Sequence, residues 1–61
     1  MNKVYAVERR GVVLRLFSTL ENAKRYLQLQ VLHNSLIYKE YEGYWKCLKF
    51  PDYAIEEWLV D

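Results

Sequence analysis

One segment of this chain has the pattern of a long amphipathic helix, and it limits the fold more than any other feature. Ser18 and Glu21 match the capping box that opens many helices. Asn34-Ser35 supplies a stop, so we predict about 15 residues of helix. The apolar residues Leu20, Ala23, Leu27 and Val31 lie within about 60° of one another on this helix. One such helix covers only one face of a sheet.

The rest of the chain has the residue pattern of β-structure. Residues 3–7 and 12–17 predict a hairpin, with Gly11 in the connection, where a positive φ is often required. Residues 36–41 and 44–50 predict two further strands that join near Glu42-Gly43.

The last segment, residues 53–60, leaves two alternatives. Asp52 could cap a short helix that buries Ile55, Trp58 and Leu59. A strand would instead place Ile55 and Leu59 on one face, with Trp58 and Val60 on the other.

Both ends of the chain resemble a group of very small phage and bacterial proteins of unknown function. The resemblance lies in Lys3-Val4-Tyr5-Ala6-Val7, in Leu16-Phe17-Ser18-Thr19 with Glu21, Ala23 and Tyr26, and in Ile55-Glu56-Glu57-Trp58 with Asp61. It implies two strands, a helix and a final strand that closes the sheet, which favours the strand alternative for residues 53–60. It also implies a phage or mobile-element setting, where small proteins often bind host proteins. Residues 35–52 are longer and more aromatic than the usual connection.

Together these patterns predict one α+β domain over residues 1–61. We expect an antiparallel sheet of four or five strands with one helix packed on one face, in the order β-β-α-β-β-β. A chain this short needs a dense core, disulfides, a metal or a partner. Its single cysteine, Cys47, excludes an internal disulfide, whereas 52% of its residues are apolar. We therefore expect a dense core and a reducing, cytoplasmic location, which is the host cytoplasm if the protein is phage-encoded.

The sequence predicts neither an enzyme nor a metal or cofactor site. Cys47 and His33 are the only soft ligands, fewer than a structural zinc ion needs. Glu56 and Glu57 are adjacent, so a strand would point them to opposite faces and prevent a catalytic pair. Gly11 and Gly43 are too few for a phosphate-binding loop. The N-terminus resembles neither a signal peptide nor a membrane span, so we expect no membrane partner.

Aromatic residues point to protein binding as the leading function. Seven of the ten aromatic side chains lie in residues 38–58. Tyr and Trp dominate protein interfaces because they bury much area at low entropic cost. The alternative is that these rings form the core that so small a fold needs. Leu29 and Leu32 project away from the apolar stripe of the helix and fit a partner contact or plain exposure. The predicted contact residues are Tyr38, Tyr41, Tyr44, Trp45, Leu29 and Leu32.

Charge distribution supports a second alternative, nucleic-acid binding. Residues 1–33 carry six basic and two acidic side chains, net +4, whereas residues 34–61 carry three and six, net −3. The two halves could also simply attract each other within one fold. The candidate phosphate contacts are Arg9, Arg10, Arg15, Lys24 and Arg25. A pI near 7.8 is low for such a protein. A homodimer with a structural role is the third alternative.

Overall fold

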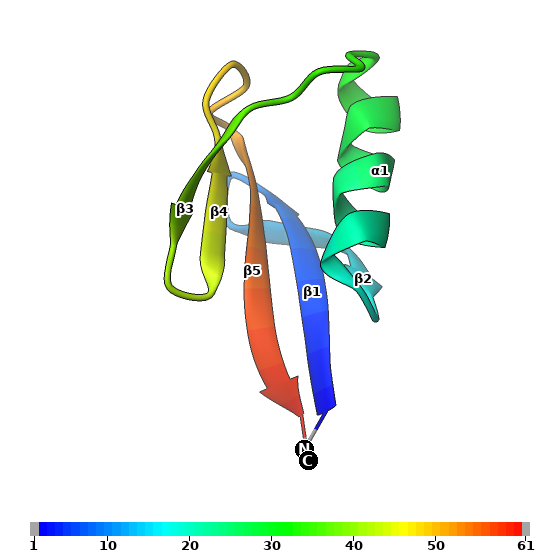
Figure 1. The fold of residues 1–61 in the computed structure, drawn as a ribbon, viewed down its shortest axis with the longest axis vertical. Helices are drawn as coiled ribbons and strands as arrows, with labels where there is room; N and C mark the ends of the chain where they lie inside the picture. Colours follow the sequence, from blue (N-terminus) through cyan, green and yellow to red (C-terminus); the bar gives the residue numbers. More distant parts are fainter. Residues whose placement is uncertain (1, 61) are drawn as a thin grey trace.

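The fold is a five-stranded antiparallel sheet with one helix, as the sequence predicts. A computed structural model describes residues 2–60 (Figure 1). The elements follow in the order β1 (Asn2–Arg9), β2 (Val12–Phe17), α1 (Leu20–Val31), β3 (Tyr38–Tyr41), β4 (Tyr44–Cys47) and β5 (Tyr53–Val60). The strand alternative for residues 53–60 is thereby confirmed, and β5 is paired with β1 along its whole length.

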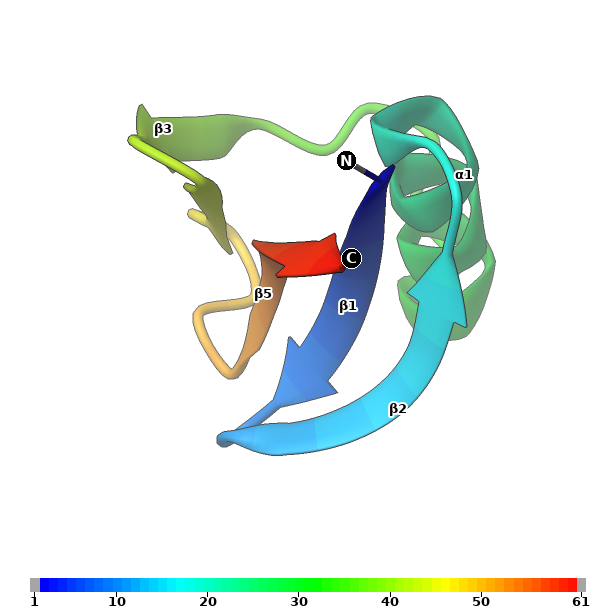
Figure 2. The ribbon, with the colours of Figure 1, turned by 90° about the horizontal axis from the view of Figure 1, so that it is seen from below.

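The strands lie side by side in the order β2-β1-β5-β4-β3, so β2 and β3 are the two edges. The sheet is strongly curled, and α1 lies on its concave side (Figure 2). We call the helix-facing side concave and the opposite side convex. The backbone of the helix lies close to β1, β2 and β5, whereas β3 and β4 reach the helix only through their side chains. In Figure 2 no element covers the convex side within residues 2–60.

The first hairpin closes through a tight two-residue turn. Arg10 and Gly11 both have positive φ, 52° and 81° respectively. This backbone matches the right-handed twist of the flanking strands, and glycine adopts it without steric cost. The first strand extends further towards the turn than predicted, because Glu8 and Arg9 belong to β1, whereas β2 has the predicted bounds. The third and fourth strands are shorter than predicted. β3 begins at Tyr38 instead of residue 36, and β4 ends at Cys47 instead of residue 50.

The helix begins later and ends earlier than predicted. Thr19, rather than Ser18, is the N-cap, and its Oγ1 accepts a hydrogen bond from the Asn22 backbone N–H at 3.1 Å. The predicted capping box is therefore wrong by one residue, because Asn22 occupies the position expected for Glu21. At the other end, Leu32 adopts the left-handed conformation and stops the helix at 12 residues, before Asn34-Ser35.

Thr19→Ala is expected to lower the free energy of unfolding by about 1 kcal/mol, because it removes the side chain that satisfies an unpaired N–H of the first helical turn. Ser18→Ala, next to it, should change that free energy by less than about 0.5 kcal/mol. Urea denaturation of both variants, followed by circular dichroism, measures the difference. Equal losses would show that the cap is shared.

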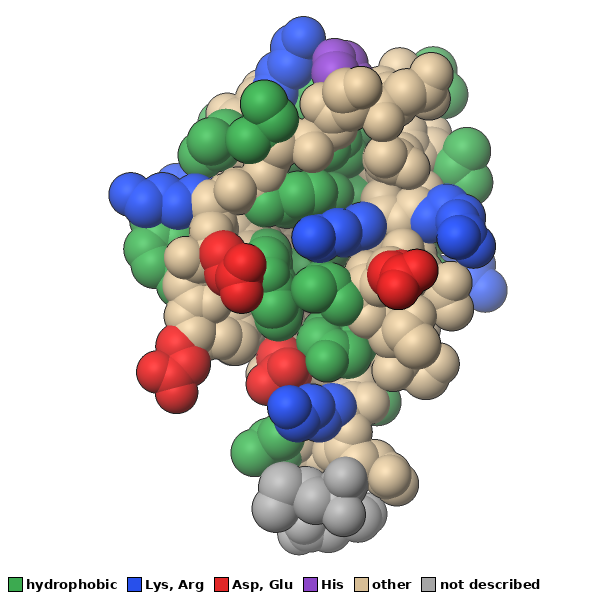
Figure 3. All heavy atoms as spheres, viewed as in Figure 1, with side chains coloured by type: hydrophobic (Ala, Val, Ile, Leu, Met, Phe, Trp, Pro, Cys, Tyr) green, Lys and Arg blue, Asp and Glu red, His purple; other side chains and the backbone are tan. Residues whose placement is uncertain are grey.

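The core lies between α1 and the concave side of the sheet. Ala23 and Leu27 of the predicted helix stripe are fully buried, against Val7 of β1 and Ile55 of β5. Figure 3 looks at the concave side and shows apolar side chains in a band between the β3–β4 hairpin and α1. This core is small, so the stability of the chain depends on few side chains.

Candidate functional site

Strand alternation divides the predicted aromatic surface between the two sides of the sheet. Trp45 lies on the concave side, because it pairs with Ile55 in the core under α1. Tyr38 lies on the same side, because it pairs with Cys47 of that core. Tyr41 and Tyr44 pair directly on the convex side, with ring centroids 6.0 Å apart. Trp45 is only 7% exposed and belongs to the core. These four residues therefore form no single contact surface.

Tyr38 is held inside the molecule more than a contact residue would be. Its hydroxyl is buried and has no hydrogen-bond partner among residues 2–60. Burial is the main cause that raises the pKa of Tyr38 to about 12, and the nearby Cys47 is the second cause. The Lys24 ammonium lies over the ring, 5.1 Å from its centroid. Tyr38 and Lys24 together bridge the space between β3 and α1.

The two predicted helix contacts have different surroundings. Leu29 is 68% exposed and lies at the rim of a hollow between α1 and β2. Leu32 is almost fully exposed at the helix C-cap. Only Leu29 is therefore placed beside other groups that could bind a partner.

The five predicted phosphate contacts lie in three separate places. Arg10 forms an ion pair with Asp52, with 3.2 Å between Nε and Oδ2. Arg9 lies over the Tyr53 ring and lines a shallow hollow of about 300 Å³ that also contains Asp52. Lys24 lies over Tyr38, as described above. Arg9 and Arg10 thus both lie beside the Asp52 carboxylate, and Arg15 and Arg25 share a different hollow.

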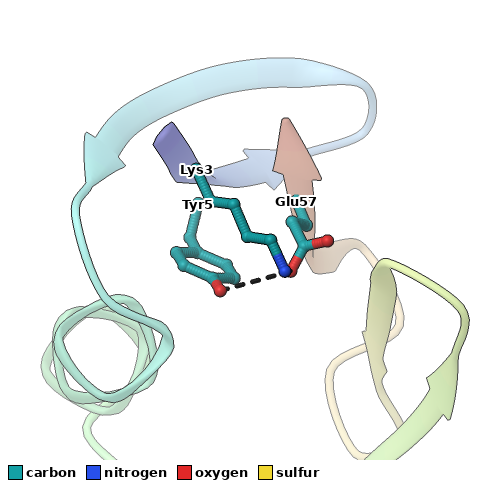
Figure 4. Close-up of polar contacts among 3 residues, drawn as sticks. All are labelled: Lys3, Tyr5 and Glu57. Atoms are coloured by element: carbon teal, nitrogen blue, oxygen red, sulfur yellow. Dashed lines mark hydrogen bonds and ion pairs between the residues drawn. The ribbon is translucent and has the colours of Figure 1, made fainter. Parts of the chain in front are cut away.

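Polar side chains at the open end of the concave side form a hydrogen bond and an ion pair with one another. The Tyr5 hydroxyl donates a hydrogen bond to Glu57 Oε2 at 3.2 Å, and Lys3 Nζ lies 3.7 Å from the same oxygen (Figure 4). The Glu57 backbone N–H donates to the Gly43 carbonyl at 2.8 Å. This group joins β1, β5 and the β3–β4 turn, and its exposed ion pair adds little to stability.

Two carboxyl groups face each other on the convex side. Glu8 on β1 and Glu56 on β5 are diagonal neighbours, since Glu8 pairs with Ala54. Burial, and then the hydrogen bond and charge of Glu56, raise the pKa of Glu8 to about 7. Hydrogen bonds from Trp58, at 3.0 Å, and then from Glu8 lower the pKa of Glu56. Glu8 therefore carries the shared proton.

Glu8→Gln is expected to raise the melting temperature at pH 8 by about 5 °C. Folded Glu8 keeps its proton up to about pH 7, whereas the unfolded side chain loses it near its ordinary pKa of 4.5. The folded state thus binds more protons in this window, so the free energy of unfolding falls as pH rises from 4.5 to 7. Partial exposure limits the effect to about 1 kcal/mol. Thermal melts between pH 5 and 8 check it.

The control for this prediction is Glu42→Gln, which removes an exposed carboxylate in the β3–β4 turn. The Glu42→Gln variant should keep the pH dependence of the wild type, whereas Glu8→Gln should flatten it. Parallel pH profiles for the wild type and Glu8→Gln would contradict the shared proton.

The β2 edge is the most unusual surface of the molecule. Five of its six residues are apolar, and four of these are exposed large side chains: Val12, Val13, Leu14 and Leu16. The opposite edge, β3, has the sequence Tyr-Lys-Glu-Tyr, and charged edge strands of this kind resist pairing with other chains. The run of apolar residues in Val12–Phe17 is visible in the sequence, but its place at an edge is not.

A β-bulge restricts how this edge can pair. Val7 pairs with Arg15 and Glu8 pairs with Val13, so Leu14 has no partner on β1. Bulges are common at sheet edges, where they interrupt pairing. The bulge divides β2 into two regularly paired stretches, residues 12–13 beside the turn and residues 15–17, which lead into α1. Among residues 2–60, β2 makes no backbone hydrogen bond to an element other than β1.

A hollow of about 260 Å³ lies between residues 15–17 and α1. Two aromatic rings, of Phe17 and Tyr26, have centroids 5.2 Å apart. The Arg15 guanidinium lies 5.8 Å from each centroid. Arg25 Nη1 donates to Asn22 Oδ1 at 3.5 Å. The hollow is lined by Arg15, Phe17, Asn22, Arg25, Tyr26 and Leu29.

Two other kinds of site are absent from the described part of the chain. Across residues 2–60, His, Cys, Asp and Glu side chains form no group of three or more that could hold a metal ion. Within the same residues, no helix combines the length and apolar character that spanning a membrane requires. The β2 edge and the adjoining hollow are therefore the candidate site.

Comparison with protein-family models, curated proteins and solved structures finds no match to this chain.

Proposed function

We propose that the chain is a non-enzymatic protein-binding module that takes an extended segment of a partner protein as an additional strand along β2. One observation carries the proposal: an edge strand whose side chains are apolar on both sides of the sheet and whose outward backbone groups are free. Such an edge pairs readily with another strand. The partner's backbone gives affinity, and its alternating side chains give specificity.

The neighbouring surface favours a protein as the occupant. Leu16 and Val13 are exposed on the convex side of β2, and Leu29 is exposed on the helix beyond the hollow. An added strand would cover apolar groups on both sides of the sheet at once. The resemblance to small phage proteins leads us to propose a host protein as the partner.

A photo-crosslinking experiment tests the proposal with a control matched in exposure. Benzoylphenylalanine is placed at Leu16, 49% exposed on β2, or at Tyr41, 47% exposed on β3. Both positions lie on the convex side, at opposite edges. In bacterial lysate we expect a specific adduct from position 16 only, mapped by mass spectrometry to an extended segment of the partner.

Two outcomes would overturn the proposal. Equal adducts from positions 16 and 41 would show nonspecific contact. An adduct with a second copy of this chain, together with a dimer mass by light scattering, would instead support the homodimer alternative.

A further inference from the structure

We infer that the hollow beside β2 binds the carboxylate of an acidic side chain in the partner's segment. This inference rests on the proposed strand addition and specifies the chemistry of the segment. The hollow combines two positive groups with an aromatic floor, and it opens beside residues 15–17, one of the two stretches of β2 where regular pairing is available.

The two guanidinium groups lack an acidic partner within the described residues. The ion pairs of residues 2–60 are Lys3–Glu57 and Arg10–Asp52, and neither involves Arg15 or Arg25. Glu21 lies four residues before Arg25 on the helix, a spacing that often gives an ion pair, yet none forms. Arg15 is instead held over Phe17 and Tyr26. A planar guanidinium stacked in this way keeps its N–H groups free for a carboxylate.

The hollow beside Arg9 shows the contrast. It has a similar volume and also contains basic residues, Arg9 and Lys49. Asp52, however, lines it and already pairs with Arg10. An incoming anion would meet a carboxylate there. Of these two hollows in the part of the chain that the structure describes, the one with Arg15 and Arg25 has positive charge without a carboxylate in its lining.

Sheet geometry predicts where the acidic side chain must lie in the partner. Residues on an added strand alternate between the two sides of the sheet. Arg15 and Phe17 face the concave side, where the hollow is, whereas Leu16 faces the convex side. A partner residue next to Arg15 therefore points to the hollow, and its two neighbours point to the convex side near Leu16. The expected pattern is apolar, acidic, apolar.

Charge favours a single carboxylate over a nucleic acid. The other three predicted phosphate contacts lie elsewhere, and residues 34–61 carry a net charge of −3. A polyanion gains affinity from many phosphate contacts, whereas this hollow offers two. A carboxylate on an extended peptide uses both guanidiniums and the free edge together.

The test is a titration of ¹⁵N-labelled protein with the peptide acetyl-Thr-Thr-Val-Glu-Val-Thr-Thr-amide. The matched peptide has Gln in place of Glu. We expect shifts of the backbone amides of residues 15–17 and of the Nε–H signals of Arg15 and Arg25. The Gln peptide should bind about tenfold more weakly.

Protein variants locate the effect. Arg15→Gln/Arg25→Gln should remove the preference for the Glu peptide, whereas Arg9→Gln/Lys49→Gln, which changes net charge equally, should keep it. Circular dichroism checks that both variants fold, and both variant pairs are at exposed positions.

The outcomes separate this inference from the proposed function. If both peptides shift the residue 15–17 amides equally, strand addition stands and the carboxylate inference is overturned. If the Glu peptide shifts only the arginine signals, carboxylate binding in the hollow is supported and the proposed strand addition is overturned. If neither peptide shifts any signal, the carboxylate inference is overturned and crosslinking alone decides the proposed function. Tighter binding of a short oligothymidylate to the same arginines would overturn the inference and indicate a nucleic acid as the ligand of the hollow.

Discussion

Trp45→Ala is expected to lower the free energy of unfolding by about 3–5 kcal/mol, whereas Trp58→Ala should lower it by about 1 kcal/mol or less. Trp45 is 7% exposed, pairs with Ile55 across β4 and β5, and lies 5.9 Å from the Tyr5 ring. Trp58 is 36% exposed on the convex side. Removing the first ring leaves a cavity in the core, and removing the second does not.

The size of the chain magnifies this difference. A domain of 61 residues has a total stability of roughly 3–9 kcal/mol, so the Trp45 variant should be largely unfolded at 37 °C. Thermal melts followed by far-ultraviolet circular dichroism compare the two variants. Similar melting temperatures for both would contradict the assignment of Trp45 to the core.

Leu27→Ala is expected to lower the free energy of unfolding by about 2–5 kcal/mol, and Leu29→Ala by less than about 0.5 kcal/mol. The two leucines are two residues apart on α1. Leu27 is fully buried against the sheet, while Leu29 is 68% exposed. The same chemical deletion therefore leaves a cavity at one position and only trims the surface at the other.

Urea denaturation measures the loss of unfolding free energy. The slope of that free energy against urea concentration should be the same in both variants as in the wild type. Leu29→Ala should instead weaken binding at the β2 edge, because Leu29 lines the hollow there. A large loss of stability for Leu29→Ala would contradict the exposed position of Leu29 on the helix.

The local elements follow from short-range chemistry, and the sequence predicts them well. The β1–β2 turn follows from glycine at position 11, and the helix from its apolar spacing. The predicted N-cap is wrong by one residue, because Ser18 and Thr19 have equally suitable side chains, and Thr19 is the one with the extended backbone of an N-cap. Segment 53–60 is ambiguous locally, and pairing with β1 makes it a strand.

The candidate site is harder to predict because it depends on which residues meet. The sequence predicts Arg15 as a phosphate contact and Leu29 as a contact with a partner protein. The fold places them on the rim of the same hollow, 14 positions apart in the chain. The prediction of Trp45 as a contact residue rests on its residue type, which is equally suited to a core and to an interface.

The sequence by itself determined the elements: one capped helix with an apolar stripe, a hairpin turn at Gly11, and enough apolar side chains for one small core. These depend on contacts between residues close in the chain. Only the tertiary structure decided that β2 is an edge, that Trp45 is buried, and that Arg15 and Arg25 share a hollow. Those properties depend on strand order and on the curl of the sheet. Both arise from pairing and packing between segments that are distant in the sequence.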